Sequence, residues 1–362
     1  MNGHTGPYLS LLMAIQEDPL STVSDLVSRV KGSKPTIIKR LKYLRENQYF
    51  WVQALLNNHN LGFEAVDVLL DTHSLDDVKR LEQVVTNHPY TVYRSRCFGS
   101  HNGLFVQFRT PIGTRPLVEE LVRLLHEEGV VSNGQIFSMG RGPTVRSSMK
   151  LEAWSPESMT WRFDWKDWFE RDCKKVRVVR PRKNPGSALK WFNTNDVYIL
   201  QQLMIDAKRP QTEMIRAIKK KGPTITPQTF GRRLRLIRRE CVEKYRVAFN
   251  PRAFDIITNI LVRGRGSKKF LQDLYSRMST NPIPFESTLR TADHDLFWAV
   301  RMPPSHLSSL LTNLHGNLED MSVTLLDYSQ SFLYSIWPAT LNEEAHEWRQ
   351  DREFMIDQAL KK

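Results

Sequence analysis

The sequence has few cysteines and no long apolar run. Its three cysteines, Cys97, Cys173 and Cys241, lie far apart without CxxC spacing or a neighbouring histidine cluster, so neither a disulfide framework nor a zinc site is expected. No stretch approaches the roughly 18 to 20 consecutive apolar residues of a membrane span, and no signal-peptide pattern opens the chain. We also find no phosphate-binding loop, nucleophile motif or paired carboxylates. These absences predict a cytoplasmic protein that has no metal or other cofactor, does not contact membranes and is not an enzyme.

The positive charge is concentrated in two neighbouring stretches. The 362 residues carry a formal net charge of +13. Residues 174–189 contain six basic and no acidic side chains, and residues 190–250 contain 14 basic and 5 acidic ones. Residues 56–173 and 251–362 are slightly acidic. This division predicts that selected parts of the protein contact a polyanion.

The chain contains an internal repeat. A shift of 193 places superimposes residues 40–45 (RLKYLR) on residues 233–238 (RLRLIR), and both segments end a pattern of three amphipathic helices. Ser33 and Thr226 precede the two third helices, whose first turns contain Pro35 and Pro227. After each third helix, an alternating stretch (49–56 and 242–249) predicts the strands of a wing. These patterns predict two winged helix-turn-helix domains.

A second kind of domain follows each three-helix unit. The predicted order is strand, helix, strand, strand, helix, strand, at residues 65–70, 74–87, 91–98, 104–108, 114–128 and 135–139, and again at 256–262, 268–280, 285–290, 296–301, 305–314 and 323–326. This βαββαβ order is typical of a ferredoxin-like sandwich. The predicted fold class is therefore α+β, with two winged helix-turn-helix and two ferredoxin-like domains in tandem repeat.

These assignments divide the chain into six segments. We expect a first winged helix-turn-helix (1–56), a ferredoxin-like regulatory domain (57–145), a Trp-rich tail with a basic linker (146–189), a second winged helix-turn-helix (190–250), a second ferredoxin-like domain (251–335) and a C-terminal helical tail (336–362). A shift of 183 pairs Trp154 with Trp337 and Trp165 with Trp348. We therefore expect the tryptophans to pack a tail against the sheet rather than to stack on single-stranded nucleic acid.

The free faces of the third helices are the main candidate binding residues. In a helix-turn-helix such a face enters the DNA major groove, where arginine and glutamine can read bases. The candidates are Lys34, Thr36, Lys39 and Arg40 in the first copy and Gln228, Thr229, Arg232, Arg233 and Arg235 in the second, with Arg238, Arg239, Lys219, Lys220 and Lys221 placed for phosphates. A solvated helix face is the alternative, but five arginines within residues 232–239 favour DNA.

At this point the sequence resembles the Lrp/AsnC family of transcription regulators. The resemblance lies in residues 55–70 (LLNNHNLGFEAVDVLL), in residues 247–262 (VAFNPRAFDIITNILV) and in the turn at residues 98–103 (FGSHNG). It implies sheets that pair within one chain as a pseudo-dimer, with homodimerisation as a further state, and recognition helices at half-sites roughly 34 Å apart. It also implies a small-molecule effector near the turns, with Gly99, His101, Asn102 and Asp293 as candidates, although ordinary tight turns also explain them.

Three functions remain to be compared. The main prediction is a sequence-specific, nucleoid-associated transcription regulator that binds double-stranded DNA with two recognition helices and senses an effector. The first alternative is a tetrapyrrole enzyme similar to the siroheme decarboxylases, which share the fold; His101 and His294 would then contact a porphyrin. The second is an architectural chromatin protein with little sequence preference. Because the enzyme alternative leaves the uneven charge unexplained, we expect the regulator.

Overall fold

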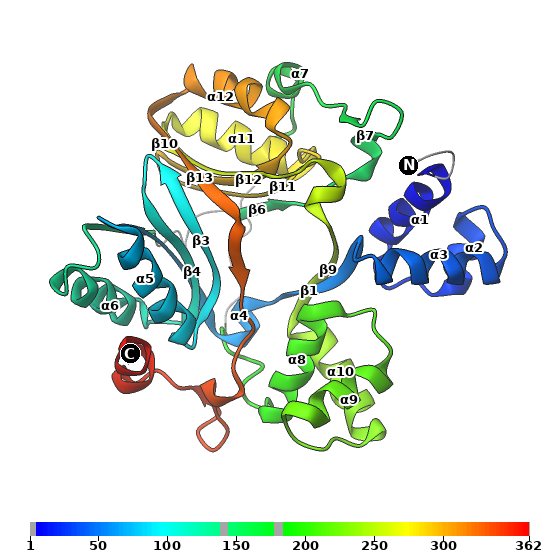
Figure 1. Ribbon diagram of the computed structural model, residues 1–362, viewed down its shortest axis with the longest axis horizontal. Coiled ribbons are helices and arrows are strands. Elements are labelled where there is room, and N and C mark those ends of the chain that lie inside the picture. Colours follow the sequence, from blue (N-terminus) through cyan, green and yellow to red (C-terminus); the bar gives the residue numbers. More distant parts are fainter. Residues whose placement is uncertain (1–4, 138–143, 177–183, 362) are drawn as a thin grey trace.

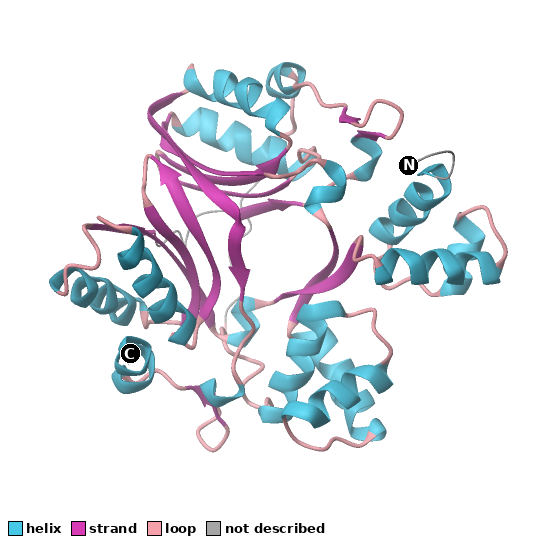
Figure 2. Ribbon diagram, in the orientation of Figure 1, coloured by secondary structure: helices cyan, strands magenta, loops and turns pink. Residues whose placement is uncertain are grey.

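The computed structural model describes residues 5–137, 144–176 and 184–361. It is a mixed α+β fold built around one curled antiparallel sheet (Figures 1 and 2). The predicted α+β class with an antiparallel sheet is therefore confirmed. Within the described residues, no helix has the length and apolar character needed to cross a membrane.

Two three-helix units lie on one side of the molecule (Figure 1). Their helices are α1 (Thr5–Glu17), α2 (Val23–Arg29) and α3 (Lys34–Glu46), and α8 (Thr194–Asp206), α9 (Gln211–Lys221) and α10 (Pro227–Glu240). Local chemistry explains where they begin: Thr22 and Asp25 form a reciprocal capping box at α2, and the Thr226 hydroxyl accepts from the Thr229 backbone at α10. Such caps satisfy amide groups that have no partner inside the helix.

A two-stranded ribbon joins the two helical units. Strand β1 (Phe50–Leu56) pairs antiparallel with β9 (Val242–Phe249), with Gln53 directly opposite Arg246. The backbone amide of Ala207, at the end of α8, donates to the carbonyl of Val52. The second helical unit is therefore bonded to β1, the strand that follows the first unit. The ribbon crosses the middle of the molecule (Figure 1).

Nine strands form the large sheet in the order β5-β2-β4-β3-β13-β10-β12-β11-β6. They are β2 (Phe63–Asp71), β3 (Thr91–Gly99), β4 (Gly103–Pro111), β5 (Asn133–Phe137), β6 (Thr144–Ser147), β10 (Thr258–Gly266), β11 (Glu286–Ala292), β12 (Asp295–Met302) and β13 (Leu318–Leu333). The two edge strands, β5 and β6, are consecutive in sequence. The sheet is strongly curled, because Asp67 on β2, next to the edge strand β5, forms an ion pair with Arg290 on β11, next to the edge strand β6.

Strand β13 holds the two halves of the sheet together. The sequence predicts a strand at residues 323–326, but β13 contains 16 residues. Its first part pairs with β10 and its second part with β3, where Leu325 lies opposite Phe98. The extension was not predicted because its burial alternates irregularly and its second partner lies far away in sequence.

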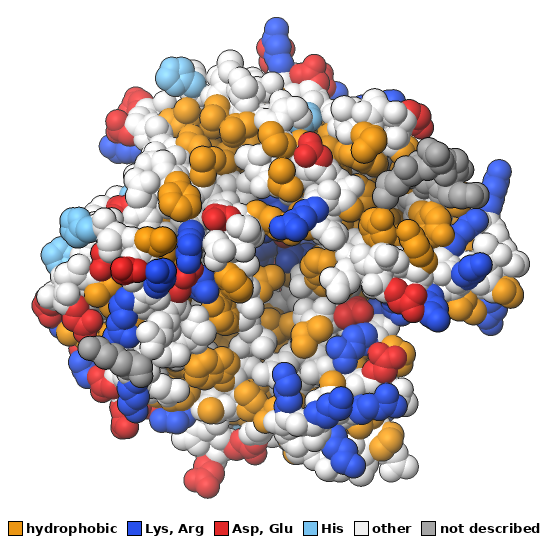
Figure 3. All heavy atoms as spheres, viewed as in Figure 1, with side chains coloured by type: hydrophobic (Ala, Val, Ile, Leu, Met, Phe, Trp, Pro, Cys, Tyr) orange, Lys and Arg blue, Asp and Glu red, His pale blue; other side chains and the backbone are white. Residues whose placement is uncertain are grey.

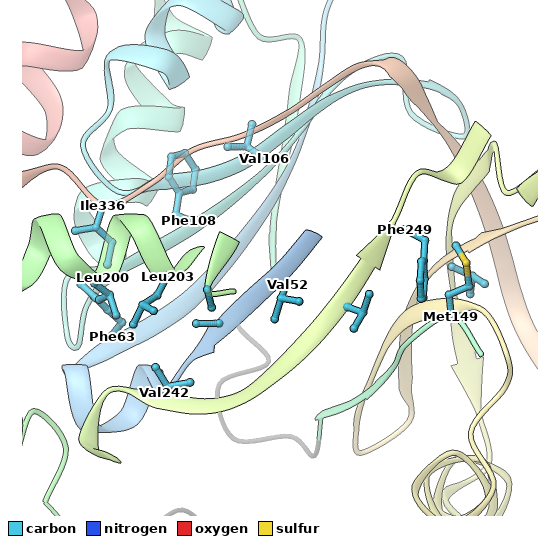
Figure 4. Packing of buried hydrophobic residues seen from close by; sticks show 14 of the residues in the cluster. Val52, Phe63, Val106, Phe108, Met149, Leu200, Leu203, Val242, Phe249 and Ile336 are labelled. Carbon is cyan, nitrogen blue, oxygen red and sulfur yellow. The ribbon is translucent and has the colours of Figure 1, made fainter. Parts of the chain in front are cut away.

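Helices cover the outer face of the sheet, and a smaller apolar cluster lies on the inner face. Helices α5 (Leu75–Asn87) and α6 (Arg115–Glu127) pack on one half, and α11 (Lys268–Thr280) and α12 (Leu307–His315) on the other (Figure 1). The main core continues from these layers through the ribbon to α8 (Figure 4). The inner cluster consists of Leu69, Tyr93, Cys97, Phe105, Leu261, Phe297 and Leu326.

Short elements complete the chain. They are α4 (Asn58–Leu61), η1 (Leu151–Ala153), β7 (Trp154–Ser155), β8 (Thr160–Trp161), α7 (Trp165–Glu170), η2 (Pro251–Phe254), η3 (Pro304–His306), η4 (Pro338–Thr340), β14 (Leu341–Asn342), β15 (Glu347–Trp348), η5 (Glu353–Asp357) and α13 (Gln358–Leu360). Trp161, Trp165 and Trp168 are buried, which agrees with packing rather than stacking on nucleic acid. Residues 177–183 of the predicted basic linker lie outside the described residues.

Candidate functional site

The molecular surface is hollowed at its centre (Figure 3). In Figure 1 this position lies between the β1–β9 ribbon and strands β6, β11 and β13. Lys or Arg side chains lie at the rim of the hollow and within it. We call this feature the central hollow. Arg146, Arg246 and Arg290 come from β6, β9 and β11, which surround it in Figure 1. Arg109 and Arg301 belong to the same network of charges, and we call the five the arginines of the hollow.

A buried carboxylate organises the first arginine group. Asp67 lies on the inner face of β2, between apolar neighbours that face the helices, and has no exposed surface. Its Oδ2 lies 2.5 Å from Nη1 of Arg290 and its Oδ1 lies 3.4 Å from Nη1 of Arg109. The Gln107 amide also donates to Oδ2, at 3.1 Å. Asp67 therefore binds side chains from β4 and β11, which belong to opposite halves of the sheet.

A second carboxylate links the sheet to the ribbon. Glu286 on β11 lies 2.8 Å from Nη1 of Arg246 on β9 and 3.3 Å from Nη1 of Arg301 on β12. The Gln53 side chain on β1 accepts from Nε and Nη2 of Arg246, at 3.3 and 3.1 Å. Burial alone would raise the pKa of Glu286, but the two guanidinium charges outweigh it and lower that pKa. Glu286 is therefore ionised and holds two strands and the ribbon together.

The arginines of the hollow crowd one another. The pKa of Arg109 is lowered to about 10, because burial and the charges of Arg290 and Arg146 together outweigh the opposing charge of Asp67. Burial also lowers the pKa of Arg146, with Arg290 and Arg246 contributing repulsion. The nearest carboxylate to Arg146 is Glu243, at 3.9 Å, and the Arg146 side chain remains 35% exposed. Arg109, with a pKa of about 10, stays protonated near neutral pH.

The central hollow therefore has an excess of positive charge. Five arginines share three carboxylates, those of Asp67, Glu243 and Glu286. Crowded cations are stabilised by an added anion, and a planar guanidinium group binds a carboxylate through two parallel hydrogen bonds. The wall of the hollow is thus chemically suited to a ligand with several carboxylates.

A separate cavity of about 410 Å³ lies where the two helical units meet. It is lined by Arg45, Gln48, Phe50, Trp51, Asp206, Arg209, Pro210 and Glu213. Its two arginines are matched by two carboxylates, so it lacks the cationic excess of the central hollow.

The predicted DNA-binding residues lie on the helical units, away from the inner face of the sheet. Lys34, Lys39, Lys219, Lys220, Lys221, Gln228, Arg232, Arg235 and Arg239 are exposed. Arg233 points inward, where Nε donates to Asp196 at 2.6 Å and Nη2 donates to the Trp191 carbonyl at 2.8 Å. Arg40 donates to the Lys31 carbonyl, and Arg238 is half-buried. Thr36 and Thr229 contact the cap residues Ser33 and Thr226.

The predicted effector residues are only partly brought together. His101 is buried, with Nδ1 2.9 Å from Oδ2 of Asp71 and Nε2 3.0 Å from Nη1 of Arg263. The Asn102 backbone donates to Asp71 at 2.7 Å, and its amide donates to the Gly99 carbonyl.

The second turn is different. Asp293 and His294 are exposed in the turn between β11 and β12, where Asp293 has φ 48°. The two histidines therefore do not form an equivalent pair. Asp71 follows Asp67 by four residues on β2, about 13 Å along the strand, so His101 lies beside a different part of the inner face from the five arginines.

The sequence analysis missed the five arginines of the hollow. The five come from five different strands, β4, β6, β9, β11 and β12, and are spread over residues 109–301 of the sequence. The available signal was a charged residue between apolar ones, such as Asp67 in AVDVLL, which indicates a charge on a sheet face. Only the strand pairing shows which charges meet.

Comparison with known proteins finds similarity in structure. No protein-family model and no curated protein sequence matches the chain. The crystal structure of the siroheme decarboxylase NirDL matches with a TM-score of 0.53 and 12% identity, over 94% of this chain and 96% of that one. The same enzyme with an iron-uroporphyrin III analogue matches with a TM-score of 0.52 and 12% identity, over 93% and 95%. An AsnC family regulator from Agrobacterium tumefaciens has 20% identity and a TM-score of 0.30, over 36% and 86%.

These matches correct the functional prediction. The expectation of a DNA-binding transcription regulator that is not an enzyme is wrong, because the structure that matches over almost the whole chain is that of an enzyme. At 12% identity, the full-length similarity concerns the fold.

Proposed function

We propose that this protein is an enzyme that binds a tetrapyrrole with several carboxylates in the central hollow and removes carboxylate groups from it as CO2. The observation that carries the proposal is the cluster of five arginines with too few carboxylates of its own. The full-length similarity to a siroheme decarboxylase supports the choice of substrate class. In this proposal the exposed Lys and Arg side chains of α3, α9 and α10 are solvated and bind no ligand.

The arginines are suited to hold the carboxylates that stay on the substrate. Decarboxylation breaks the bond between a carboxylate and its neighbouring carbon, CO2 leaves, and the electron pair on that carbon takes up a proton. No oxidant or reductant is needed. A guanidinium paired with the departing carboxylate would stabilise the starting anion more than the neutral product, so it would slow the step.

The departing carboxylate therefore belongs beside the apolar cluster of the inner face. The guanidinium of Arg290 lies 5.5 Å from the centre of the Phe297 ring, and that ring lies 6.1 Å from the Phe105 ring. Apolar surroundings destabilise a charged carboxylate more than neutral CO2, so they promote the loss of CO2 from the substrate. The substrate would thus be anchored at one end by charge and react at the other.

Tyr93 is the proposed proton donor on this inner face. It is 9% exposed and belongs to the inner apolar cluster. Its hydroxyl lies 3.0 Å from the Ser331 hydroxyl and accepts from the Asn259 amide at 3.2 Å. These contacts orient the hydroxyl, so that it can deliver a proton to the carbon that CO2 leaves.

We also propose that the chain consists of two tandem copies, each a winged helix-turn-helix followed by a ferredoxin-like domain. The proposed boundaries are those expected above, with 1–56 and 57–145 in the first copy and 190–250 and 251–335 in the second. The repeated order of helices and strands supports this layout. The curled sheet is then an internal pairing of two ferredoxin-like sheets.

The experiment uses binding and product analysis together. Addition of iron-uroporphyrin III to the purified chain should shift its Soret band with saturation, and incubation with siroheme should give products lighter by successive CO2 units in mass spectrometry. Arg290→Gln should weaken binding by about tenfold or more, because it removes a charge-assisted contact. Arg235→Gln, an exposed arginine on α10, is the matched control and should bind as the unaltered protein does. An unaltered protein that neither binds the porphyrin nor releases CO2 would rule out the proposal.

A further inference from the structure

The β1–β9 ribbon places one arginine beside the central hollow. Arg246 and Gln53 occupy directly opposite positions on the two strands. Arg246 donates to the Gln53 side chain and to Glu286 of the sheet. The Arg246 side chain remains 25% exposed. At Arg246 the ribbon therefore both contacts the sheet and presents a cation to solvent.

The internal repeat explains why the position opposite Arg246 has a glutamine and not a second arginine. The shift of 193 that superimposes the two third helices also superimposes Gln53 on Arg246. Because these residues are also cross-strand partners, the two-fold axis of the proposed tandem layout passes between them. In two identical chains this position would carry the same side chain twice, and two arginines directly opposite would repel. A single fused chain can have arginine on one side and a hydrogen-bond acceptor on the other.

The charge of Arg246 is not fully neutralised. Glu286 is shared between Arg246 and Arg301, at 2.8 and 3.3 Å. The charge of Arg246 also acts on Arg146, whose own nearest carboxylate, Glu243, is 3.9 Å away. Two guanidinium groups thus share one close carboxylate where the ribbon meets the sheet, and the charge of Arg146 repels that of Arg246.

We propose that the β1–β9 ribbon is a wall of the substrate site and that Arg246 binds a peripheral carboxylate of the tetrapyrrole. This inference rests on the proposed function and deepens it. Arg246 is then a specificity-determining residue, because a substrate that lacks the matching carboxylate gains nothing from it. The strands expected to be the wings of a DNA-binding domain would select the substrate by its number of carboxylates.

The test compares two iron porphyrins that differ in carboxylate number. Dissociation constants of iron-uroporphyrin III and of iron-coproporphyrin III, which has fewer carboxylates, are measured from Soret titrations at fixed salt concentration. Arg246→Gln should weaken iron-uroporphyrin III binding by about tenfold, as expected for one charge-assisted contact. Binding of iron-coproporphyrin III should change by less than about twofold. Arg246→Lys, which keeps the charge without the bidentate geometry, should give an intermediate loss.

Controls separate recognition from folding. Arg235→Gln should leave both constants unchanged. Glu286→Gln, which removes the partner of Arg246 but keeps Arg246 itself, should lower the thermal midpoint and retain the preference for iron-uroporphyrin III. If the unaltered protein binds neither porphyrin, the proposed function fails and this inference fails with it. If it binds iron-uroporphyrin III and Arg246→Gln weakens neither porphyrin, or both equally, the proposed function stands and only the role of Arg246 is overturned.

Discussion

Two tryptophans show how individual side chains anchor the tails. Trp161 and Trp348 each end a short hairpin, and each donates its indole N–H to a backbone carbonyl, of Phe254 and Leu61 respectively. The sequence analysis paired Trp165 with Trp348 instead, at a shift of 183. In the proposed tandem layout the counterpart of Trp348 is Trp161, because the hairpin and the hydrogen bond recur at a shift of 187. Matching two tryptophans by residue type alone was less reliable for finding corresponding positions than comparing the carbonyl group that each indole N–H binds.

His88 links stability to pH. It is buried against the Phe108 ring, and its Nδ1 accepts from the Tyr90 backbone amide at 3.2 Å. Burial lowers its pKa to about 3, whereas the unfolded chain has a pKa of about 6.5 for this group. The unfolded state therefore binds the proton first as pH falls. Stability from neutral His88 is complete above about pH 6.5 and is lost as the pH drops below that value.

We expect His88→Asn to reduce this pH dependence. Between pH 7.5 and 5.5, the free energy of unfolding of the unaltered protein should fall by about 1.4 kcal/mol more than that of the variant, because one proton must be removed to fold. Urea unfolding at both pH values measures the difference, and asparagine keeps an acceptor for the Tyr90 amide. Equal pH dependence of the two proteins would contradict a buried neutral histidine.

At the scale of elements, the closure of the sheet depends on pairs that are remote in sequence. Asp67 and Arg290 are separated by 223 residues, and they join β2 to β11 across the interior. The helix starts at Ser33 and Thr226 were predictable, because a small polar residue followed closely by proline is a signal carried by neighbouring residues. The closed sheet and its arginines were not, because they depend on which strands pair. The same limit explains the long strand β13.

Removal of the buried carboxylate should loosen this closure. Asp67→Asn leaves Arg109 and Arg290 without their shared counter-charge in a place with no exposed surface, and an unpaired buried charge costs about 3 to 5 kcal/mol. Urea unfolding near neutral pH should show a loss of that size. Glu119→Gln, which breaks an exposed pair with Arg115 on α6, is the control and should change stability little. A loss no larger than the control would mean that the Asp67 pairs do not hold the sheet closed.

At the scale of the whole molecule, the two halves of the inner face are unequal. Residues 104–109 (LFVQFR) correspond to residues 296–301 (LFWAVR), with Phe105 and Phe297 both in the inner cluster. On this alignment Gln107 corresponds to Ala299. The other corresponding positions follow from the strand register, and they pair Asp67 with Leu261 and Arg290 with Ser95. Only Arg109 keeps a charged counterpart, Arg301.

This inequality predicts one bound tetrapyrrole per chain. An anion with several carboxylates needs several cations, and Arg290 and its partner Asp67 have the uncharged counterparts Ser95 and Leu261, so this arginine group occurs once in the chain's described residues. Titration of a known concentration of protein with iron-uroporphyrin III should reach its end point at one equivalent, and Arg290→Gln should weaken that single event without revealing a second one. An end point at two equivalents would mean that Leu261, Ala299 and Ser95 line a working site, and the charge distribution would then not determine where the ligand binds.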